Sequence, residues 1–358
     1  MHSKIAIITH RSDHRGGMER YALDIAYQLA DEGRLAALIT KSHSSTARLK
    51  NPLPIKSLGL RWLPAKLQTL LFSFYCYWYK KRHPEVILFA CSKIFCSDII
   101  ACGGTHWGYL NSQSKKPTWL DRIEIFYEKW AYQKAICIVA HSPQMRQELI
   151  QWYGINTDKI ITLYPPVDQQ KFHIASNKGD RKNLLRQLNI EIDNRCVFLF
   201  PSSGHKRKGL EILLKAFACF EKQAILLIAG KKPRFEQSNV IALGYVSNMP
   251  PWYAACDYTI LASTYEPFGL VALESILCGT PILLSHSCGC NAVLSETVRI
   301  NFHAEDLEEL KAVLAKTINN PFRVDDPLKY IKTSMEIKSH LTEIFSYFNN
   351  KHAIGYYD

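Results

Sequence analysis

Short apolar runs alternate with amphipathic stretches along almost all of the 358 residues, and this alternation restricts the fold more than any other feature. The runs with the length and composition of strands are residues 4–9, 35–40, 85–91, 98–102, 136–141, 160–164, 197–201, 224–229, 240–243, 258–262 and 281–285. Between the first two runs, apolar residues recur at helical spacing at Tyr21, Ala22, Ile25, Ala26 and Leu29. Strands that alternate with helices predict parallel sheets covered by helices, an α/β fold.

Two consecutive prolines, Pro165 and Pro166, interrupt the pattern near its middle, in the sequence YPPVDQQKF. They exclude a helix and favour an extended path, which is typical of a linker. A chain of this length also exceeds what one hydrophobic core usually supports. We therefore expect two Rossmann-like domains, residues 1–168 and 169–335, and a last segment, 336–358, whose helix can cross back to the N-terminal domain.

Positive charge is concentrated in the N-terminal half. The chain has a net charge of +12, and residues 1–170 hold 22 Lys and Arg against 13 Asp and Glu. Six of the seven tryptophans lie in the same half. A partner that is both anionic and partly apolar, such as a lipid headgroup surface, fits this composition. Nucleic acid is the competing interpretation, although it is not the expected partner.

The segment LQTLLFSFYCYWYKKR, residues 67–82, is rich in apolar and aromatic residues and ends in a basic cluster. It is shorter than the roughly 20 apolar residues that span a bilayer. A helix that lies on a membrane surface has this composition, and so has a crossover helix buried in the core, which is the commoner case.

The N-terminus and the cysteines bear on the location of the chain. The sequence MHSKIAIITHRSDH becomes polar directly after residues 5–8, unlike a secretion signal, so we expect a cytoplasmic protein. The eleven cysteines include no C-x-x-C pair, and reduced, buried thiols are expected. The sequence therefore predicts no zinc or other metal site.

Two strand-to-helix turns have the composition of anion sites. Gly16 and Gly17 directly precede a helix, so backbone N–H groups there can approach a phosphate or a sugar closely, although a plain tight turn has the same sequence. In PSSGHKRKGLEILLKAF, residues 201–217, Arg207 and Lys208 lie in the turn. Two cations at the C-terminal end of a parallel strand would neutralise a diphosphate, whereas in isolation such a cluster is more often a solvated basic loop.

The stretch TYEPFGLVALES, residues 264–275, places Glu266 and Glu274 on either side of a helix-breaking Pro-Phe-Gly. Pro267 fits the first turn of a helix, so Glu266 is expected to end a loop and Glu274 to lie inside the helix. The free N–H groups where that helix begins suit an anion. The pattern indicates a phosphate site between two acceptors, or else an ordinary turn with one capping acid.

Together these segments resemble glycosyltransferase family 4, the retaining sugar-nucleotide transferases of GT-B architecture. The resemblance covers nearly the whole chain and is carried by the Gly16-Gly17 turn, SSGHKRKGL, GYVSNMPPWYAACDYTILAS and, most specifically, EPFGLVALESILCGTPIL. It implies a GT-B fold in which two Rossmann-like domains face a central cleft. The KRKG variant is similar to the lipopolysaccharide core glucosyltransferases of the family, although many members have Gly-Arg where this chain has Ser202-Ser203.

The resemblance also implies roles for residues of the C-terminal domain. Glu274 would hold the ribose of the donor, and Glu266 would contact its sugar. Arg207 and Lys208 would stabilise the departing diphosphate. The backbone N–H groups that would bind the phosphates belong to Phe268, Gly269, Leu270 and Val271.

Three residues of the N-terminal domain receive roles in the same way. Gly16 and Gly17 would close over the diphosphate. His106, in CGGTHWGYL, would contact the sugar near its anomeric carbon, with a satisfied core histidine as the alternative. His141, in VAHSPQM, is a second candidate for the cleft.

The implied enzyme moves a hexose from a nucleotide diphosphate sugar, with UDP-glucose the first guess, to a glycolipid acceptor in lipopolysaccharide core or a related cell-surface glycan. The departing phosphate would take the acceptor's proton on the same face and so retain the anomeric configuration. No Asp-x-Asp motif occurs, in agreement with a metal-independent transferase without a cofactor. Such an enzyme would work against the anionic, cytoplasmic face of the inner membrane.

Two alternatives stay open. A sugar-nucleotide epimerase of the same architecture needs no acceptor, so the product formed from the donor alone distinguishes it. A basic protein that binds nucleic acid or lipid without catalysis would show salt-sensitive binding and no affinity for sugar nucleotides.

Overall fold

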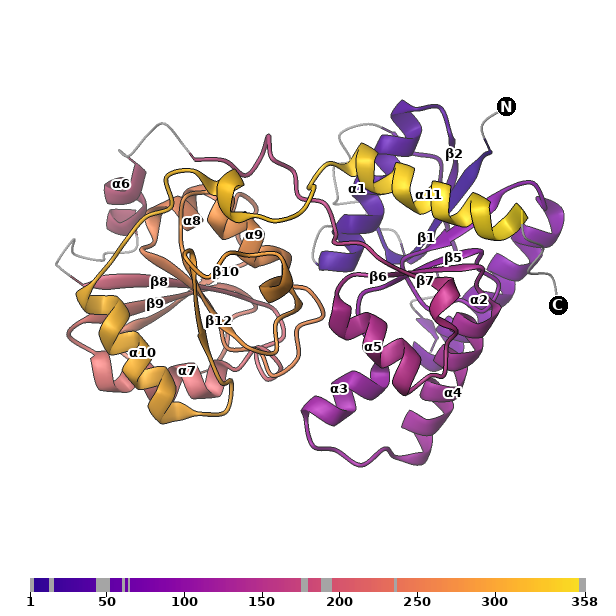
Figure 1. Cartoon of the computed structure of the whole chain (residues 1–358). Helices are drawn as coiled ribbons and strands as arrows, with labels where there is room; N and C mark the ends of the chain where they lie inside the picture. The colour runs from indigo at the N-terminus through magenta and orange to yellow at the C-terminus, as the bar shows by residue number, and fades with distance from the viewer. Residues whose placement is uncertain are drawn as a thin grey trace. The chain divides into compact units, whose positions relative to one another are not determined.

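The computed structural model describes residues 3–12, 16–42, 52–59, 62–63, 65–174, 180–187, 195–234 and 237–353 (Figure 1). The chain forms two compact units. Unit 1 is Met1–Pro166 together with Ser334–Asp358, and unit 2 is Val167–Thr333. The change from unit 1 to unit 2 falls within residues 164–172, the segment with the composition of a linker.

Unit 1 contains a seven-stranded sheet in the order β3-β2-β1-β4-β5-β6-β7, and its neighbouring strands are parallel. The strands are β1 (Ile5–Arg11), β2 (Leu35–Ser42), β3 (Ile55–Ser57), β4 (Ile87–Ala90), β5 (Ile99–Cys102), β6 (Cys137–Ala140) and β7 (Ile160–Thr162). The strand order reverses between β1 and β4, as in a doubly wound Rossmann sheet. This confirms the predicted α/β class for the first half of the chain.

The helices of unit 1 cover both faces of this sheet. They are α1 (Gly17–Asp31), α2 (Ala65–Arg82), α3 (His106–Ser112), α4 (Trp119–Lys134), α5 (Pro143–Gln151) and α11 (Ile337–Ala353), with a short 3₁₀ turn, η2 (Thr157–Lys159). In Figure 1, α1 and α11 lie over one face of the sheet, and α2 and α4 lie over the other.

The last helix, α11, belongs to the core of the first unit. Its apolar side chains Leu341, Ile344, Phe345 and Phe348 are buried among residues of α1 and the sheet. Outside this core, the Tyr347 hydroxyl donates to the carbonyl oxygen of Asp158 over 2.8 Å. The C-terminal segment therefore packs on the unit that contains the N-terminal half of the chain.

Only one side of α2 is buried. Phe72, Cys76 and Tyr79 face the interior, whereas Phe74 and Trp78 expose about half of their surface, 48% and 51%. Two interpretations were left open for residues 67–82, and full burial in the core does not hold for one side of α2. Among the residues described by the structure, no helix is both long and apolar enough to cross a membrane.

Unit 2 repeats the architecture with six parallel strands in the order β10-β9-β8-β11-β12-β13. The strands are β8 (Cys196–Ser202), β9 (Ala224–Gly230), β10 (Val240–Gly244), β11 (Tyr258–Leu261), β12 (Ile282–Ser285) and β13 (Arg299–Phe302). The helices are α6 (Asp180–Gln187), α7 (Leu210–Phe217), α8 (Pro250–Ala255), α9 (Leu270–Leu277) and α10 (Leu307–Asn319), with the 3₁₀ turns η3 (Ala218–Phe220), η4 (Gly289–Ala292) and η5 (Pro327–Tyr330). Figure 1 shows α7 and α10 on one face and α8 and α9 on the other.

Two strands, β3 and β13, were absent from the sequence prediction. Both lie at a sheet edge, where one side of the strand has no neighbour. Lys56 and Ser57 of β3 are exposed, and β13 begins with the polar pattern Arg-Ile-Asn. An edge strand can form without a continuous apolar run, and these two have none, so the apolar pattern does not reveal them.

Candidate active site

The candidate site of unit 2 lies where the strand order reverses, between β8 and β11. Open α/β sheets bind ligands at such a point, outside the carboxyl ends of the strands. Two loops leave the sheet there, residues 203–209 after β8 and residues 262–269 after β11. The backbone N–H of Thr264 donates to the carbonyl oxygen of Arg207 over 3.0 Å and ties these loops together.

Arg207 and Glu266 form an ion pair at this point. Arg207 Nη1 lies 3.0 Å from Glu266 Oε2 and also donates to the carbonyl oxygen of Tyr265. The two side chains keep 29% and 14% of their surface exposed, so the pair is partly open to a ligand. The structure thus brings together a cation and an acid that are 59 positions apart in the sequence.

The backbone holds Glu266 in an extended position. Its N–H donates to the carbonyl oxygen of Ser287 over 3.3 Å, and its own carbonyl oxygen accepts from Gly289 over 2.9 Å. These bonds join the loop after β11 to the loop after β12, with Glu266 bridged to Cys288. The prediction that Glu266 lies in a loop is confirmed.

The loop after β8 is shaped by a left-handed glycine. Gly209 has φ 77°, which other residues adopt only with strain, and it directly precedes α7. A Cβ atom there would lie 2.1 Å from the carbonyl oxygen of Ala262, at the end of β11. The adjacent Lys208 donates from Nζ to the carbonyl oxygen of Pro201 over 3.0 Å. The close approach of the two loops therefore requires a glycine.

Helix α9 begins at Leu270, three residues later than the position of Pro267 predicted. Gly269 has φ 96°, a left-handed conformation that a helix cannot contain, so it caps the helix instead. Gly269 has no side chain that could accept hydrogen bonds from the first N–H groups of α9. The N–H groups of Leu270 and Val271 belong to this first turn. The backbone N–H group of Phe268 was expected to bind a phosphate, and the side chain of this residue is buried.

Glu274 lies inside α9, as predicted, and is buried. Only 3% of its surface is exposed, and its Oε2 accepts a hydrogen bond of 2.8 Å from the hydroxyl of Tyr253 in α8. Tyr253 is itself fully buried. This tyrosine was not singled out from the sequence, because its role depends on how α8 and α9 pack together.

His205 is a second residue that the sequence did not single out. Its Nε2 lies 2.7 Å from the carbonyl oxygen of Lys231, so this nitrogen carries the proton and donates. Its Nδ1 then accepts from the Ser202 hydroxyl over 2.9 Å. The histidine joins the ends of β8 and β9 and supports the loop that carries Arg207.

In unit 1, Gly16 precedes α1 with an ordinary extended conformation, φ −123°. A Cβ atom there would lie 2.0 Å from Glu19 Oε2, so the Glu19 side chain would have to move. The carboxylate of Glu19 thus lies beside the start of α1, where the helix dipole favours a negative charge. Gly17 is the first residue of the helix.

His106 begins α3 and is held by acidic groups of α4. Its Nε2 lies 2.8 Å from Asp121 Oδ1, and its Nδ1 lies 3.6 Å from Glu124 Oε1. Hydrogen bonds from Thr118 and His106 lower the pKa of Asp121 to about 2. The His106 side chain therefore lies between two carboxylates of α4.

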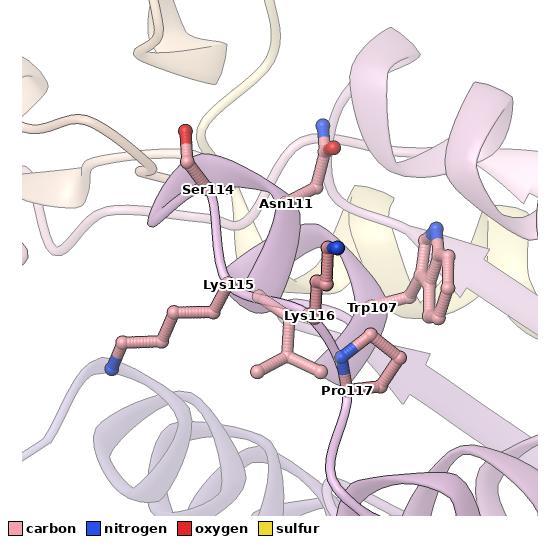
Figure 2. A pocket seen from close by; sticks show the side chains of 7 residues that line it. Trp107, Asn111, Ser114, Lys115, Lys116 and Pro117 are labelled. Carbon is pink, nitrogen blue, oxygen red and sulfur yellow. The ribbon is translucent and has the colours of Figure 1, made fainter.

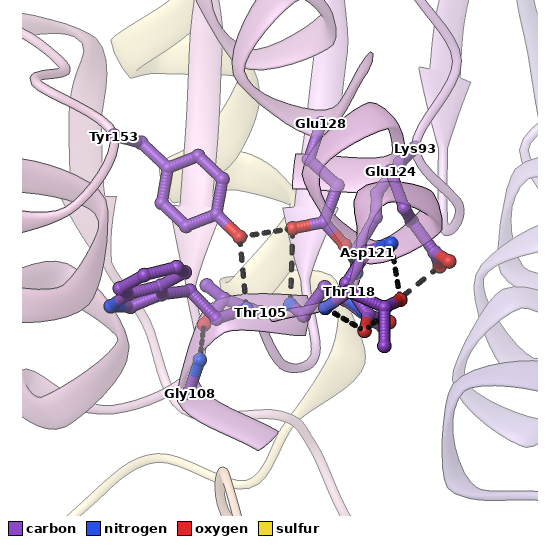
Figure 3. A network of polar contacts seen from close by, with 10 residues as sticks. Lys93, Thr105, Gly108, Thr118, Asp121, Glu124, Glu128 and Tyr153 are labelled. Carbon is purple, nitrogen blue, oxygen red and sulfur yellow. Dashed lines mark hydrogen bonds and ion pairs between the residues drawn. The ribbon is translucent and has the colours of Figure 1, made fainter. Parts of the chain in front are cut away.

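The backbone of His106 is fixed by the buried carboxylate of Glu128. The His106 N–H donates to Glu128 Oε2 over 3.0 Å, and the same carboxylate accepts from the Tyr153 hydroxyl and from Lys93 (Figure 3). Glu128 is 1% exposed. Since a buried charge needs such partners, this network holds the start of α3 firmly in place.

His141, the second histidine candidate, is buried with 3% of its surface exposed. Its ring packs edge-on against Tyr21 at 4.7 Å, and burial lowers its pKa to about 3. The Tyr21 hydroxyl lies 2.7 Å from Nε2 of His340 in α11. In this structure His141 is therefore a neutral core residue.

A cavity of about 200 Å³ lies between α3 and the turn that leads to α4 (Figure 2). It is lined by Trp107, Leu110, Asn111, Ser114, Lys115, Lys116 and Pro117. Ser114 has φ 48°, an uncommon conformation for serine, at the turn that follows α3. A pocket with an apolar wall and two lysines suits an anionic ligand that also has an apolar part.

Another cluster consists of His286 after β12, His303 after β13 and Glu309 in α10, whose side chains are exposed or half-buried. The ligand atoms of His286, His303 and Glu309 lie within 4.8 Å of one another. Hydrogen bonds from the backbone and ring of His303 lower the pKa of Glu309. The sequence did not single out this cluster, because β13, the strand that precedes His303, was not predicted.

Comparison with known proteins links both units to one class of enzyme. Residues 15–171 match the family model for Glycosyltransferase Family 4, and residues 195–320 match the model for Glycosyl transferases group 1. A probable transglycosylase of Burkholderia thailandensis is 36% identical over 303 residues, which are 85% of this chain and 83% of that protein. A D-inositol 3-phosphate glycosyltransferase of Streptosporangium roseum is 27% identical over 54% of this chain and 49% of that enzyme.

Solved structures share the architecture. WaaG, a glycosyltransferase involved in lipopolysaccharide biosynthesis, has a TM-score of 0.76 at 18% identity and covers 88% of this chain and 90% of its own. HepE of Anabaena, solved in complex with UDP-glucose, has a TM-score of 0.71 at 18% identity and covers 99% of both chains. At these identities the likeness establishes the fold.

Proposed function

The chain belongs to glycosyltransferase family 4 and has the GT-B fold, and we propose that it transfers a hexose from a nucleotide diphosphate sugar to a glycolipid acceptor. UDP-glucose is the first candidate for the donor, and lipopolysaccharide core or a related cell-surface glycan is the candidate product. The observation that carries the proposal is the Arg207–Glu266 pair beside the uncapped start of α9.

The donor would bind at the switch point of unit 2. Within the described part of the chain, both polar contacts of the Arg207 guanidinium use Nη1, so Nε and Nη2 remain to bind a diphosphate. Lys208 and the first N–H groups of α9 would complete the anion site. Glu266 would face the sugar, and Glu274, oriented by Tyr253, would hold the ribose.

Transfer would rely on electrostatics that are set before the donor arrives. As the bond between sugar and phosphate breaks, negative charge grows on the diphosphate, and a guanidinium already fixed by Glu266 stabilises it without reorganisation. The leaving phosphate would accept the proton of the acceptor hydroxyl on the same face, which makes the reaction retaining. In this mechanism neither a metal ion nor a cofactor takes part.

In unit 1, His106 would contact the transferred sugar, and Gly16 and Gly17 would contact the diphosphate. The cavity next to α3 is our candidate for the acceptor, because Lys115 and Lys116 suit an anionic group of a glycolipid. We place the reaction at the cytoplasmic face of the inner membrane, where such an acceptor is accessible to the enzyme.

A ligand screen followed by a turnover assay tests the proposal. UDP-, ADP- and GDP-glucose are compared for the rise in melting temperature that they cause, since a bound ligand stabilises the folded state. The donor that binds is then incubated with and without glycolipid extracts, and NMR identifies the products. Transfer only in the presence of the acceptor supports the proposal, whereas conversion of the donor sugar alone indicates an epimerase. Absence of any sugar-nucleotide binding overturns it.

A further inference from the structure

Two helices of unit 1 expose apolar stripes. On α2 the residues Leu67, Leu70, Leu71, Phe74, Tyr77 and Trp78 are 40–51% exposed. On α4 the residues Trp119, Leu120, Ile123, Phe126 and Trp130 are 37–72% exposed. Both sets recur at the spacing of one helix face, so each forms a continuous stripe. We call these eleven residues, together with Phe95, the α2–α4 face.

Phe95, from the connection between β4 and β5, joins the two stripes into one surface. Its ring stacks on Trp130 of α4, with the centroids 4.5 Å apart and the planes 13° from parallel. The same ring meets Phe74 of α2 edge-on, with the centroids 6.2 Å apart. The hydroxyls of Ser73 and Tyr127 also contact each other between the two helices.

The core of unit 1 does not require these residues. The buried side of α2 is already supplied by Phe72, Cys76 and Tyr79, and α4 contributes Ala131 and Tyr132. The opposite side of a surface helix is normally polar. Folded monomers rarely expose so many contiguous apolar side chains unless another surface covers them.

The charges around the α2–α4 face are mainly positive. Helix α2 contains no acidic residue and ends in Lys80, Lys81 and Arg82. Lys81 lies over the ring of Trp78, with Nζ 5.2 Å from the centroid, and Arg82 is exposed. In the turn before α4, Lys115 and Lys116 are exposed close to Trp119 in the sequence.

Two of the three acids of α4 are turned toward the protein. Asp121 bonds Thr118 and His106, and Glu128 is buried against Tyr153. Glu124 keeps 54% of its side chain exposed, with Oε1 3.6 Å from His106 Nδ1. The face therefore presents apolar and aromatic groups bordered by cations, with few exposed carboxylates.

We propose that the α2–α4 face docks on the surface of an anionic lipid bilayer. Exposed Trp, Phe and Leu enter the headgroup boundary, and the neighbouring Lys and Arg bind anionic headgroups. A second copy fits less well, because a symmetric dimer through this face would bring the cations of one copy against those of the other. The inference deepens the proposed function, since a glycolipid acceptor lies in such a surface.

Vesicle sedimentation with the purified full-length chain tests this inference. Phosphatidylcholine vesicles with and without phosphatidylglycerol are compared at low and high salt. The double variant Trp119→Ser/Phe126→Ser removes the two most exposed aromatic rings of α4, and Lys81→Glu/Arg82→Glu reverses the charge in the last turn of α2. Leu328→Ser is the matched control, because Leu328 is 57% exposed but lies in unit 2, on η5.

The wild type and Leu328→Ser are expected to bind the anionic vesicles, and each double variant to lose about tenfold or more in binding. Equal vesicle binding by the wild type and both double variants overturns the inference. A dimer that forms with increasing protein concentration and is abolished by Trp119→Ser/Phe126→Ser also overturns it, because the face would then bind a second copy. Stabilisation by soluble donor is measured in parallel. The proposed donor site needs no lipid, so the two proposals can fail separately. A protein that binds vesicles but is not stabilised by any sugar nucleotide contradicts the proposed enzymatic function and leaves the membrane inference intact.

Discussion

Arg207 in the loop after β8 and Glu266 in the loop after β11 meet with Nη1 and Oε2 3.0 Å apart. Each loop leaves one of the two strands that flank the switch point of the sheet. The pair holds the guanidinium in one position. Because Glu266 neutralises only one cation, Lys208 adds a positive charge to the site. An anion that enters this site meets a preorganised cation, which is the basis of the first prediction.

Replacement of Arg207 by alanine is expected to lower kcat for sugar transfer by about 10²- to 10³-fold, because a group that stabilises the developing charge is lost. Arg207→Lys keeps the charge but not the planar geometry and should recover only part of the rate. Steady-state kinetics with the donor found in the ligand screen measure both. Lys215→Ala is the control, since it removes an exposed cation of α7. An unchanged kcat in Arg207→Ala contradicts the proposed role.

Two glycines of the same loop should respond differently to alanine. Gly209→Ala is expected to lower the free energy of unfolding by about 1–3 kcal/mol, because φ is positive and the new Cβ meets the carbonyl oxygen of Ala262. A Cβ at Gly204 meets no atom within 4 Å. Gly204→Ala should therefore be neutral or slightly stabilising. Urea unfolding compares them, and equal stabilities would show that the close approach of the loops is not maintained.

Tyr253→Phe is expected to weaken both donor binding and stability. The variant removes the hydroxyl that donates to Glu274 and leaves a buried carboxylate without this bond, at a cost of about 1–3 kcal/mol. Tyr258→Phe is the matched control, because its hydroxyl donates to the carbonyl oxygen of Asn320 and not to a proposed donor ligand. Only Tyr253→Phe should raise the donor KM. A KM equal to that of the wild type would make Tyr253 purely structural.

Acid should destabilise unit 1. Burial lowers the pKa of His141 to about 3 and that of His340 to about 4, from 6.5 in an unfolded chain. The unfolded chain therefore binds more protons below about pH 6.5, and stability is lost as the pH falls toward about 4. Each histidine contributes a slope of up to about 1.4 kcal/mol per pH unit.

His340→Gln should flatten this pH dependence, whereas His352→Gln, at an exposed position of the same helix, should not. Urea unfolding followed by tryptophan fluorescence reports mainly on unit 1, because six of the seven tryptophans lie in residues 1–170. A wild-type stability that is constant between about pH 6.5 and pH 4 would contradict the prediction.

The sequence predicted the α/β class and the buried strands, because a strand covered on both faces needs a continuous apolar run, as in residues 224–229. It did not reveal β3 and β13, whose edge positions relax that requirement. The predicted start of α9 was also three residues too early, because the left-handed backbone of Gly269 is a property of the folded loop.

The sequence identified most residues of the candidate site but only some of the contacts between them. Arg207, Lys208 and Glu266 were singled out because cations and acids beside helix starts suit an anion. Their mutual geometry depends on the strand order, which brings β8 next to β11 and which no local pattern encodes. The bond between Tyr253 and Glu274, and the exposure of one side of α2, likewise depend on tertiary packing.

The position of α11 has a consequence for how the chain is made. Leu341, Ile344 and Phe345 complete the core of unit 1, yet the ribosome synthesises them after all of unit 2. Unit 2 is a continuous segment, Val167–Thr333, and can fold once it has emerged. Unit 1, which is translated first, therefore keeps an apolar surface uncovered until α11 has been synthesised. In this chain, the first domain to be synthesised is the last to be completed.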